Sequence, residues 1–239
     1  MSRAEQRMRS FWDDAARANA AWYVDTTLDY ENPNMQRFFA DGRTIVSDAL
    51  DRSPVAPGGN ASALEIGSGL GRVCVALADR FDRVTGIDIS PEMVRRAREL
   101  VHDPRVMFVV GDGATLGGIG DESMDLVLSF TVFQHIPRVE VIEEYIAEAG
   151  RVLRRDGLFV FQWNNGASTW LWRVRRSTLT ILQRTGLRPE ERRRHAPEFL
   201  GSTVALPRIE RALKRAGMKI VQTRGLGSLF AWVWAVREA

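Results

Sequence analysis

The chain contains little of what several functional classes require. It has one cysteine, Cys74, and three histidines among 239 residues, so neither a disulfide framework nor a clustered metal centre is expected. We interpret Cys74 as a small buried packing residue. No apolar run is long enough to cross a membrane, and residues 1–9 are too polar for a secretory signal. We therefore predict a cytoplasmic protein with no metal ion and no transmembrane segment.

The remaining composition is that of an ordinary folded protein. Hydrophobic residues make up 45% of the chain and charged residues 26%, with a net charge of +3 and no internal repeat. This length suits one α/β domain with a small appendage. The charge is unevenly spread, because eight arginines lie from Arg173 to Arg194. Such a local basic patch is compatible with a nucleic-acid partner, an anionic substrate or a solvated helix face.

The most informative segment is a glycine-rich turn at residues 63–72, which read ALEIGSGLGR. Asp88 follows 21 positions after Gly67 and ends the next apolar run. Glycines at such a turn let the backbone approach a ligand, and a later carboxylate can accept both hydroxyls of a ribose. A dinucleotide fingerprint needs its third glycine where this chain has Arg72. The spacing therefore favours a single adenosine over a dinucleotide.

The order of expected elements predicts a doubly wound, mostly parallel α/β sheet. From residue 63 the pattern is strand, helix, strand, helix, strand, strand, helix, strand, and Ser90 followed by Pro91 predicts a helix start. We expect an N-terminal helical lid at 1–60 and an α/β domain at 61–239, with an inserted helical cap at 164–206. The other expected elements are helices at 3–21, 34–50, 138–154 and 207–216, and strands at 158–163, 219–224 and 230–237.

Four motifs together resemble the class I S-adenosylmethionine-dependent methyltransferase family of the small-molecule type. They are EIGSGLG at 65–71, TGIDISPEM at 85–93, VGDG at 110–113 and DLVLSF at 125–130. The resemblance covers about residues 60–165. It implies a Rossmann-like methyltransferase fold whose last strand is antiparallel, and S-adenosyl-L-methionine as the cofactor.

The resemblance also implies roles for individual residues. Glu65 would anchor the methionine end of the cofactor, Asp88 the ribose, and Asp112 the exocyclic amine of adenine. The other positions expected to line the cofactor are Gly67, Ser68, Gly69, Ile89, Gly113, Ser129 and Phe130. Taken singly, a glycine turn or an acid at a strand end is often only structural. Their joint occurrence favours a binding site.

Methyl transfer from a sulfonium needs alignment and exclusion of water, and it needs a base only when the acceptor must lose a proton. His135, after the fourth strand of the domain, is the candidate base, although the same segment can serve simply as the approach to a helix. The aromatic residues expected to form a lid or to contact substrate are Trp12, Trp22, Tyr23 and Trp170. The alternative for the first three is packing of the N-terminal helices on the core. Around Trp170 the alternatives are a core stripe, a substrate wall or an interfacial membrane contact.

The function predicted from these features is methyl transfer to an oxygen or nitrogen of a small molecule. Two alternatives stay open: an RNA or other nucleic-acid methyltransferase, and a cofactor-binding protein without turnover. Base-modifying enzymes carry an acid or amide before two prolines, or a cysteine, after the fourth strand. This chain instead has Ser129 and Phe130, followed by Thr131 and Val132, and its Cys74 lies elsewhere. A small-molecule acceptor is thus favoured over a nucleic acid, and the oligomeric state stays open.

Overall fold

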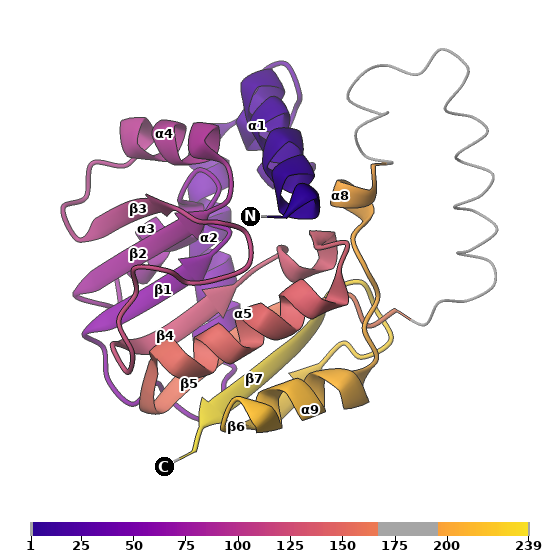
Figure 1. Cartoon of the computed structure of the whole chain (residues 1–239). Coiled ribbons are helices and arrows are strands. Elements are labelled where there is room, and N and C mark those ends of the chain that lie inside the picture. The colour runs from indigo at the N-terminus through magenta and orange to yellow at the C-terminus, as the bar shows by residue number, and fades with distance from the viewer. Residues whose placement is uncertain (1, 167–195, 239) are drawn as a thin grey trace.

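The computed structural model describes residues 2–166 and 196–238 (Figure 1). This part of the chain forms a seven-stranded sheet in the order β3-β2-β1-β4-β5-β7-β6. The strands are β1 (Ser62–Ile66), β2 (Arg83–Asp88), β3 (Val106–Val110), β4 (Met124–Ser129), β5 (Leu153–Trp163), β6 (Met218–Arg224) and β7 (Ala231–Arg237). Strands β1 to β5 pair in parallel, whereas β7 is antiparallel to both of its neighbours, β5 and β6. The predicted mostly parallel sheet with an antiparallel last strand is confirmed.

Helices cover both faces of this sheet. They are α1 (Arg3–Val24), α2 (Met35–Leu50), α3 (Arg72–Leu77), α4 (Pro91–Leu100), α5 (Val139–Val152), α8 (Pro197–Leu200) and α9 (Leu206–Arg215), with a 3₁₀ turn η1 at Phe133–His135. Side chains of α5 and α9 pack on one face, and side chains of α2, α3 and α4 pack on the other. Successive strand residues alternate between the two layers, as Val127 and Leu128 of β4 do. Both faces are therefore buried, as parallel sheets require.

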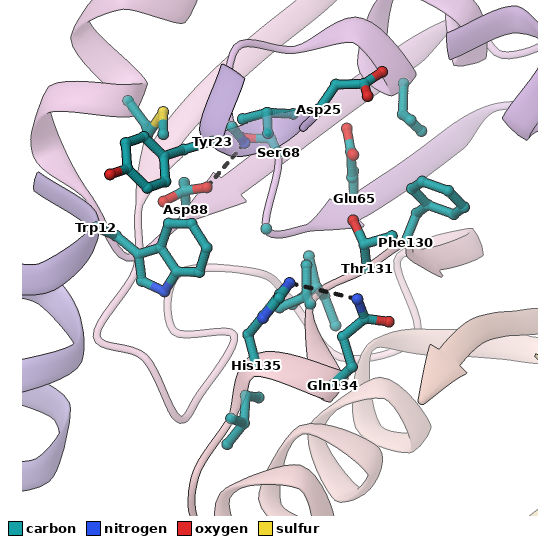
Figure 2. A pocket seen from close by; sticks show the side chains of 18 of the residues that line it. Trp12, Tyr23, Asp25, Glu65, Ser68, Asp88, Phe130, Thr131, Gln134 and His135 are labelled. Atoms are coloured by element: carbon teal, nitrogen blue, oxygen red, sulfur yellow. Dashed lines mark hydrogen bonds between the residues drawn. The ribbon is translucent and has the colours of Figure 1, made fainter. Parts of the chain in front are cut away.

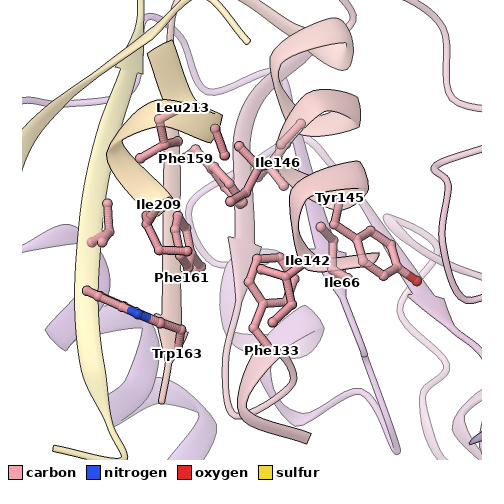
Figure 3. Packing of buried hydrophobic residues seen from close by; sticks show 14 of the residues in the cluster. Ile66, Phe133, Ile142, Tyr145, Ile146, Phe159, Phe161, Trp163, Ile209 and Leu213 are labelled. Atoms are coloured by element: carbon pink, nitrogen blue, oxygen red, sulfur yellow. The ribbon is translucent and has the colours of Figure 1, made fainter. Parts of the chain in front are cut away.

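The layer under α5 and α9 is rich in aromatic side chains. Phe133, Phe159, Phe161 and Trp163 are each fully buried there, and neighbouring ring centroids lie 4.6 to 6.3 Å apart (Figure 3). The Trp163 indole N–H donates to the carbonyl of Val204 at 3.0 Å, so its one polar atom is satisfied. Such rings each contribute a few kcal/mol of apolar burial and fix η1 beneath the end of β4.

Helix starts follow the capping signals of the sequence. Ser90 caps α4 by accepting from the Met93 amide at 3.1 Å, and Asn34 caps α2 by accepting from the Arg37 amide at 2.9 Å. The expected helix start at Ser90 is confirmed.

The junction between α5 and β5 differs from the expectation of a helix at 138–154 and a strand at 158–163. Helix α5 ends at Val152, and β5 begins at once with Leu153. In the strand, Arg154 donates to the Asp125 carboxylate at 2.8 Å, and the same carboxylate accepts from the Ser62 amide at 2.8 Å. This buried carboxylate holds β1, β4 and β5 together and favours extended backbone at Arg154 over another helical turn.

The two N-terminal helices occupy different places. Helix α2 belongs to the core, since Val46 and Ala49 are buried against α3 and the sheet. Helix α1 contacts α4 and α8 above the carboxyl ends of the strands, and it is kinked at Asn19. Of the expected lid at residues 1–60, only α1 lies where a lid could form, because α2 is part of the core. Of the expected cap insertion, residues 167–195 lie outside the described residues, whereas 196–206 include α8.

Across residues 2–166 and 196–238, no helix combines the length and the apolar character needed to cross a bilayer. Within the same ranges, no group of three or more histidine, cysteine or acidic side chains could hold a metal ion.

Candidate cofactor and acceptor site

A cavity of about 1280 Å³ opens at the carboxyl ends of β1, β2 and β4 (Figure 2). This is where the chain leaves the middle of the sheet in both directions, the usual ligand site of doubly wound folds. Pockets for a single drug-sized ligand measure roughly 300 to 1,000 Å³, so the space between the described residues suits more than one small molecule.

The glycine turn forms one wall of this cavity. Gly67 and Gly69 have φ of 77° and 50°, a left-handed conformation that favours glycine. A Cβ on Gly67 would lie 2.1 Å from a methyl carbon of Val132, and one on Gly69 would lie 2.8 Å from a methyl carbon of Val24. The amides of Gly67 and Ser68 both donate to the Ile87 carbonyl, so they close the turn instead of facing the cavity. The glycines are thus required by close packing around the turn.

Asp88 ends β2 beside this turn. One carboxylate oxygen accepts from the Gly69 amide and the other from the Ser90 amide, both at 2.8 Å. Burial raises the pKa of Asp88 to about 6, although both amides oppose the shift. Each carboxylate oxygen keeps a further lone pair, and the residue lines the cavity. The side chain is therefore held rigidly and can still accept two hydroxyl groups.

Glu65 lies deeper in the cavity, at the end of β1. Its side chain is 3% exposed and accepts from the Cys74 thiol at 2.9 Å. Burial raises the pKa of Glu65 to about 8, and the nearby Arg72 charge partly opposes this. Cys74 itself is fully buried, and burial raises the pKa of its thiol, so it is a packing residue and a weak donor rather than a nucleophile.

Arg72 connects the glycine turn to the end of α1. Its guanidinium pairs with the Asp25 carboxylate at 2.7 Å and lies 5.1 Å from the Phe38 ring and 5.8 Å from the Phe130 ring. Hydrogen bonds from Thr27 and the Arg72 charge lower the pKa of Asp25 against the opposing effect of burial. The sequence marked Arg72 only as a departure from the dinucleotide pattern, and nothing in it pointed to Asp25.

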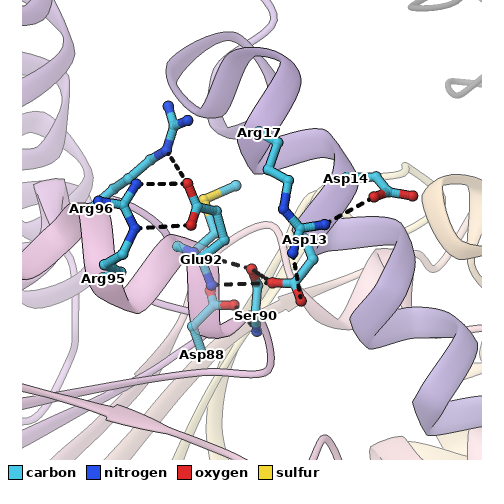
Figure 4. Close-up of polar contacts among 9 residues, drawn as sticks. Asp13, Asp14, Arg17, Asp88, Ser90, Glu92, Arg95 and Arg96 are labelled. Atoms are coloured by element: carbon cyan, nitrogen blue, oxygen red, sulfur yellow. Dashed lines mark hydrogen bonds and ion pairs between the residues drawn. The ribbon is translucent and has the colours of Figure 1, made fainter.

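The N-terminal half of α1 is attached to α4 beside Asp88 (Figure 4). Asp13 accepts from the Ser90 hydroxyl at 2.5 Å and from the Glu92 amide at 3.1 Å. Glu92 in turn holds the guanidinium groups of Arg95 and Arg96, which lower its pKa to about 2. Asp13 thus acts as a second cap on α4, supplied by a distant helix.

His135 faces the cavity from η1, on the side opposite Asp88 and Glu65 (Figure 2). Its Nδ1 is hydrogen-bonded to the Phe199 carbonyl, which can only accept, so Nδ1 carries the proton and Nε2 has the lone pair. The Gln134 side-chain nitrogen faces Nε2 at 3.4 Å. Burial lowers the pKa of His135 to about 4, so the ring is neutral at ordinary pH.

The structure brings most of the expected site residues to one cavity, but not all. Those that line it are Trp12, Tyr23, Glu65, Gly67, Ser68, Gly69, Asp88, Ile89, Phe130 and His135. Those that do not line it are Trp22, Asp112, Gly113 and Ser129, and Trp170 lies outside the described residues.

Asp112 has a local role in this structure. Its carboxylate accepts from the amides of Ala114 and Thr115 and from the Thr115 hydroxyl, at 2.6 to 2.9 Å. Gly113 packs under Ile89, whose Cδ1 would lie 2.4 Å from a Cβ at that position. These residues support the loop that Ile89 rests on, and contact with an adenine ring stays a prediction for Asp112.

Residues 64–161 match the family model described as a methyltransferase domain. This segment is therefore a methyltransferase domain of the class I S-adenosylmethionine-dependent family. The resemblance seen in the four motifs is thereby confirmed, and the cofactor of this family is S-adenosylmethionine.

Two curated relatives and one solved structure are similar to this chain. It is 36% identical over 104 residues to the malonyl-(acyl-carrier protein) O-methyltransferase of Geobacter sulfurreducens, covering 42% of this chain and 38% of that protein. It is 36% identical over 170 residues to the 2-methyl-6-phytyl-1,4-hydroquinone methyltransferase of Synechocystis, covering 64% of this chain and 52% of that protein. The chain thus spans about half or less of these relatives' lengths.

The magnesium protoporphyrin IX methyltransferase of Synechocystis, solved with bound SAH, superposes with a TM-score of 0.66. The two chains are 20% identical, and the alignment covers 98% of this chain and 100% of the other. At this identity the likeness establishes the fold.

The residues of the cavity fit the family's cofactor on local grounds. The Ser68 hydroxyl is buried on the glycine-turn wall and has no hydrogen-bond partner within the described residues. Asp88 offers a rigid acceptor for ribose hydroxyls. Glu65 offers an acidic group that could pair with the ammonium of the methionine part. A nucleoside with a cationic tail matches this order of groups.

Proposed function

We propose that this methyltransferase transfers a methyl group from S-adenosylmethionine to an oxygen or nitrogen atom of a small molecule. The observation that carries the proposal is the division of one cavity into two sides. Asp88, Glu65 and the glycine turn lie on one side, and Gln134 and His135 lie on the other (Figure 2). Two curated relatives are named for small or carrier-bound acceptors, which agrees with this proposal.

The protein's own residues would bind, orient and keep water out. When bound, S-adenosylmethionine supplies an activated methyl group: the acceptor atom attacks the methyl carbon, and the electron pair of the broken carbon–sulfur bond stays on sulfur. Asp88 would accept the ribose hydroxyls and Glu65 the ammonium, which orients the reactive carbon toward η1. Trp12 and Phe199, whose ring centroids lie 6.3 Å apart, would shield this region from water. Alignment and desolvation supply most of the rate in this scheme.

His135 is the group available for a proton. With Nδ1 protonated by the Phe199 contact, its Nε2 lone pair faces the Gln134 side-chain nitrogen at 3.4 Å, so a neutral acceptor could transfer its proton there only by displacing that contact. A pKa of about 4 makes the ring a weak base, because an efficient base has a pKa near the working pH. We therefore assign His135 a supporting part, as a hydrogen-bond acceptor that assists proton loss.

Helix α1 is the proposed lid of this site. Its Trp12 covers the His135 ring, with centroids 5.5 Å apart, and Asp13 fastens the same turn to α4. A helix in this position separates the cavity from solvent when the fastening is made.

Calorimetric titration with S-adenosylmethionine tests the cofactor side. We expect Asp88→Ala to weaken binding at least tenfold, because two hydroxyl contacts to a rigid carboxylate are lost. Asp79→Ala is the matched control, since that carboxylate pairs with Arg43 on the surface and does not line the cavity, and it should bind within about threefold of the native protein. Unchanged affinity in Asp88→Ala would remove the ribose assignment.

Transfer of a labelled methyl group tests the reaction. Label should enter the small-molecule fraction of a cell extract and leave its RNA unlabelled. Label in RNA alone would favour the nucleic-acid alternative, and binding without any transfer would favour a cofactor-binding protein.

A further inference from the structure

The side of the cavity opposite Asp88 and Glu65 has its own chemistry. We name as the acceptor wall six of the residues that line the cavity: Trp12, Phe130, Gln134, His135, Phe199 and Phe230. They come from α1, from the segment after β4, from α8 and from the turn before β7. This inference rests on the proposed function, in which the acceptor wall binds the methyl acceptor.

None of the six acceptor-wall residues is charged at neutral pH, although the Arg72 guanidinium lies 5.8 Å from the Phe130 ring. The acidic and basic side chains that line the cavity among the described residues are Asp25, Asp41, Glu65, Arg72 and Asp88, which come from the residue after α1, from α2 and α3, and from the ends of β1 and β2. Arg72 is already neutralised by Asp25. A charged acceptor on this wall would lose water without gaining a counter-ion, which costs several kcal/mol for a buried ion. The wall therefore suits a neutral molecule.

The acceptor wall nevertheless contains a buried polar atom that lacks a hydrogen-bond partner among the described residues. Because Nδ1 of His135 donates to Phe199, its Nε2 must accept, and the Gln134 amide must turn its NH₂ toward it. The Gln134 carbonyl oxygen is then left buried, and it has no hydrogen-bond partner among the described residues. A buried acceptor without a donor costs free energy that a ligand's O–H or N–H would recover.

The backbone under this atom is held in an uncommon conformation. Thr131 has φ of 56°, and left-handed geometry is costly for a β-branched residue. Thr131 also lines the cavity, so the strained position lies in the segment that carries Gln134. Local strain of this kind is retained where a fixed side-chain position serves binding.

We propose that the methyl acceptor is a neutral hydroxylated aromatic molecule, which packs on the rings of the acceptor wall and donates its hydroxyl hydrogen bond to Gln134. Flat rings gain offset or edge contacts with Trp12, Phe199 and Phe230. A phenolic hydroxyl, with a pKa near 10, is uncharged at neutral pH and supplies the missing donor. An aliphatic amine would carry a positive charge under the same conditions and would lack a partner on this wall.

Three probes with one ring system test this inference. They are 2-naphthol, 2-naphthoate and 2-naphthylmethylammonium, titrated by calorimetry with saturating SAH present and again without it. We expect 2-naphthol to bind at least tenfold more tightly than either ion. A preference for 2-naphthoate or for the ammonium, or no binding of any probe, would overturn the proposal. Failure of SAH itself to bind would count against the proposed function, and the titrations without SAH would still test the wall.

Gln134 variants identify the atom that carries the recognition. Gln134→Leu should weaken 2-naphthol binding about tenfold while leaving SAH affinity unchanged. Gln134→Glu should instead raise the relative affinity for the ammonium probe, because it places a negative charge on the wall. Gln222→Leu on β6 is the control, since that side chain is half-buried, does not line the cavity and donates to the Arg52 carbonyl at 3.2 Å. Equal 2-naphthol affinity in all three variants and the native protein would remove Gln134 from the site.

Discussion

Glu65 is expected to lose a proton when the cofactor binds. With a pKa of about 8, this carboxyl group is about 90% protonated at pH 7, and ionising it there costs about 1.4 kcal/mol. An ammonium beside it would lower the pKa well below 7 by direct charge attraction. Binding at pH 7 should therefore release about 0.9 proton from Glu65, whereas Asp88, with a pKa of about 6, contributes only about 0.1.

Calorimetry in several buffers measures this release directly. The observed binding enthalpy is plotted against the ionisation enthalpy of each buffer; release gives a negative slope, whose size is the number of protons released and is the value compared below. Glu65→Gln keeps the size of the side chain but has no proton to lose, so its slope should fall to about 0.1 at pH 7. In the native protein the slope should also fall to about 0.1 at pH 9, where Glu65 is already ionised.

Two results would refute this reasoning. One is a slope near zero for the native protein at pH 7, which would mean that Glu65 is ionised before binding or stays neutral after it. The other is an equal slope in the native protein and Glu65→Gln, which would place the proton elsewhere.

Two further predictions concern Asp25 and His135. Asp25→Ala leaves Arg72 buried without its partner and should lower the free energy of unfolding by about 3 kcal/mol in urea titrations, whereas Asp79→Ala, which breaks an exposed pair with Arg43, should change it by less than about 1 kcal/mol. Equal effects would contradict a structural role for the Asp25 pair. His135→Ala should reduce kcat less than about 100-fold, below the usual contribution of a general base. Because burial lowers the pKa of His135 to about 4, the native protein should also lose stability as pH falls from 6.5 toward 4, and this loss should be smaller in His135→Ala.

The parts of the fold that could be predicted from sequence depend on neighbours along the chain. The glycine turn, the Ser90 cap and Asp88 at the end of its strand are each specified within a few residues, and the structure places them as expected. The strand order follows from the alternation of helices and strands. The predicted bounds at the α5–β5 junction were wrong because Arg154 pairs with Asp125, and no local sequence pattern indicates this contact.

The parts of the site that could not be predicted depend on long-range packing. Asp25 and Arg72 are far apart in sequence, as are Asp13 and Ser90, and each pair forms only when α1 lies over the strand ends. The His135 tautomer is fixed by Phe199, which a sequence pattern cannot connect to it. Asp112 differs from these residues: its motif was recognised from sequence, but its carboxylate accepts hydrogen bonds within its own turn and does not line the cavity.

Helix α1 is fastened at two points, by Asp13 to Ser90 and by Asp25, the residue after the helix, to Arg72, and it is kinked at Asn19 between these points. This arrangement would allow the first half of the helix to detach while the second stays in place. Each round of catalysis would then end with a mechanical step, in which Asp13 must release Ser90 before spent nucleoside escapes. A fast first turnover followed by a slower steady rate would be the kinetic signature of this architecture.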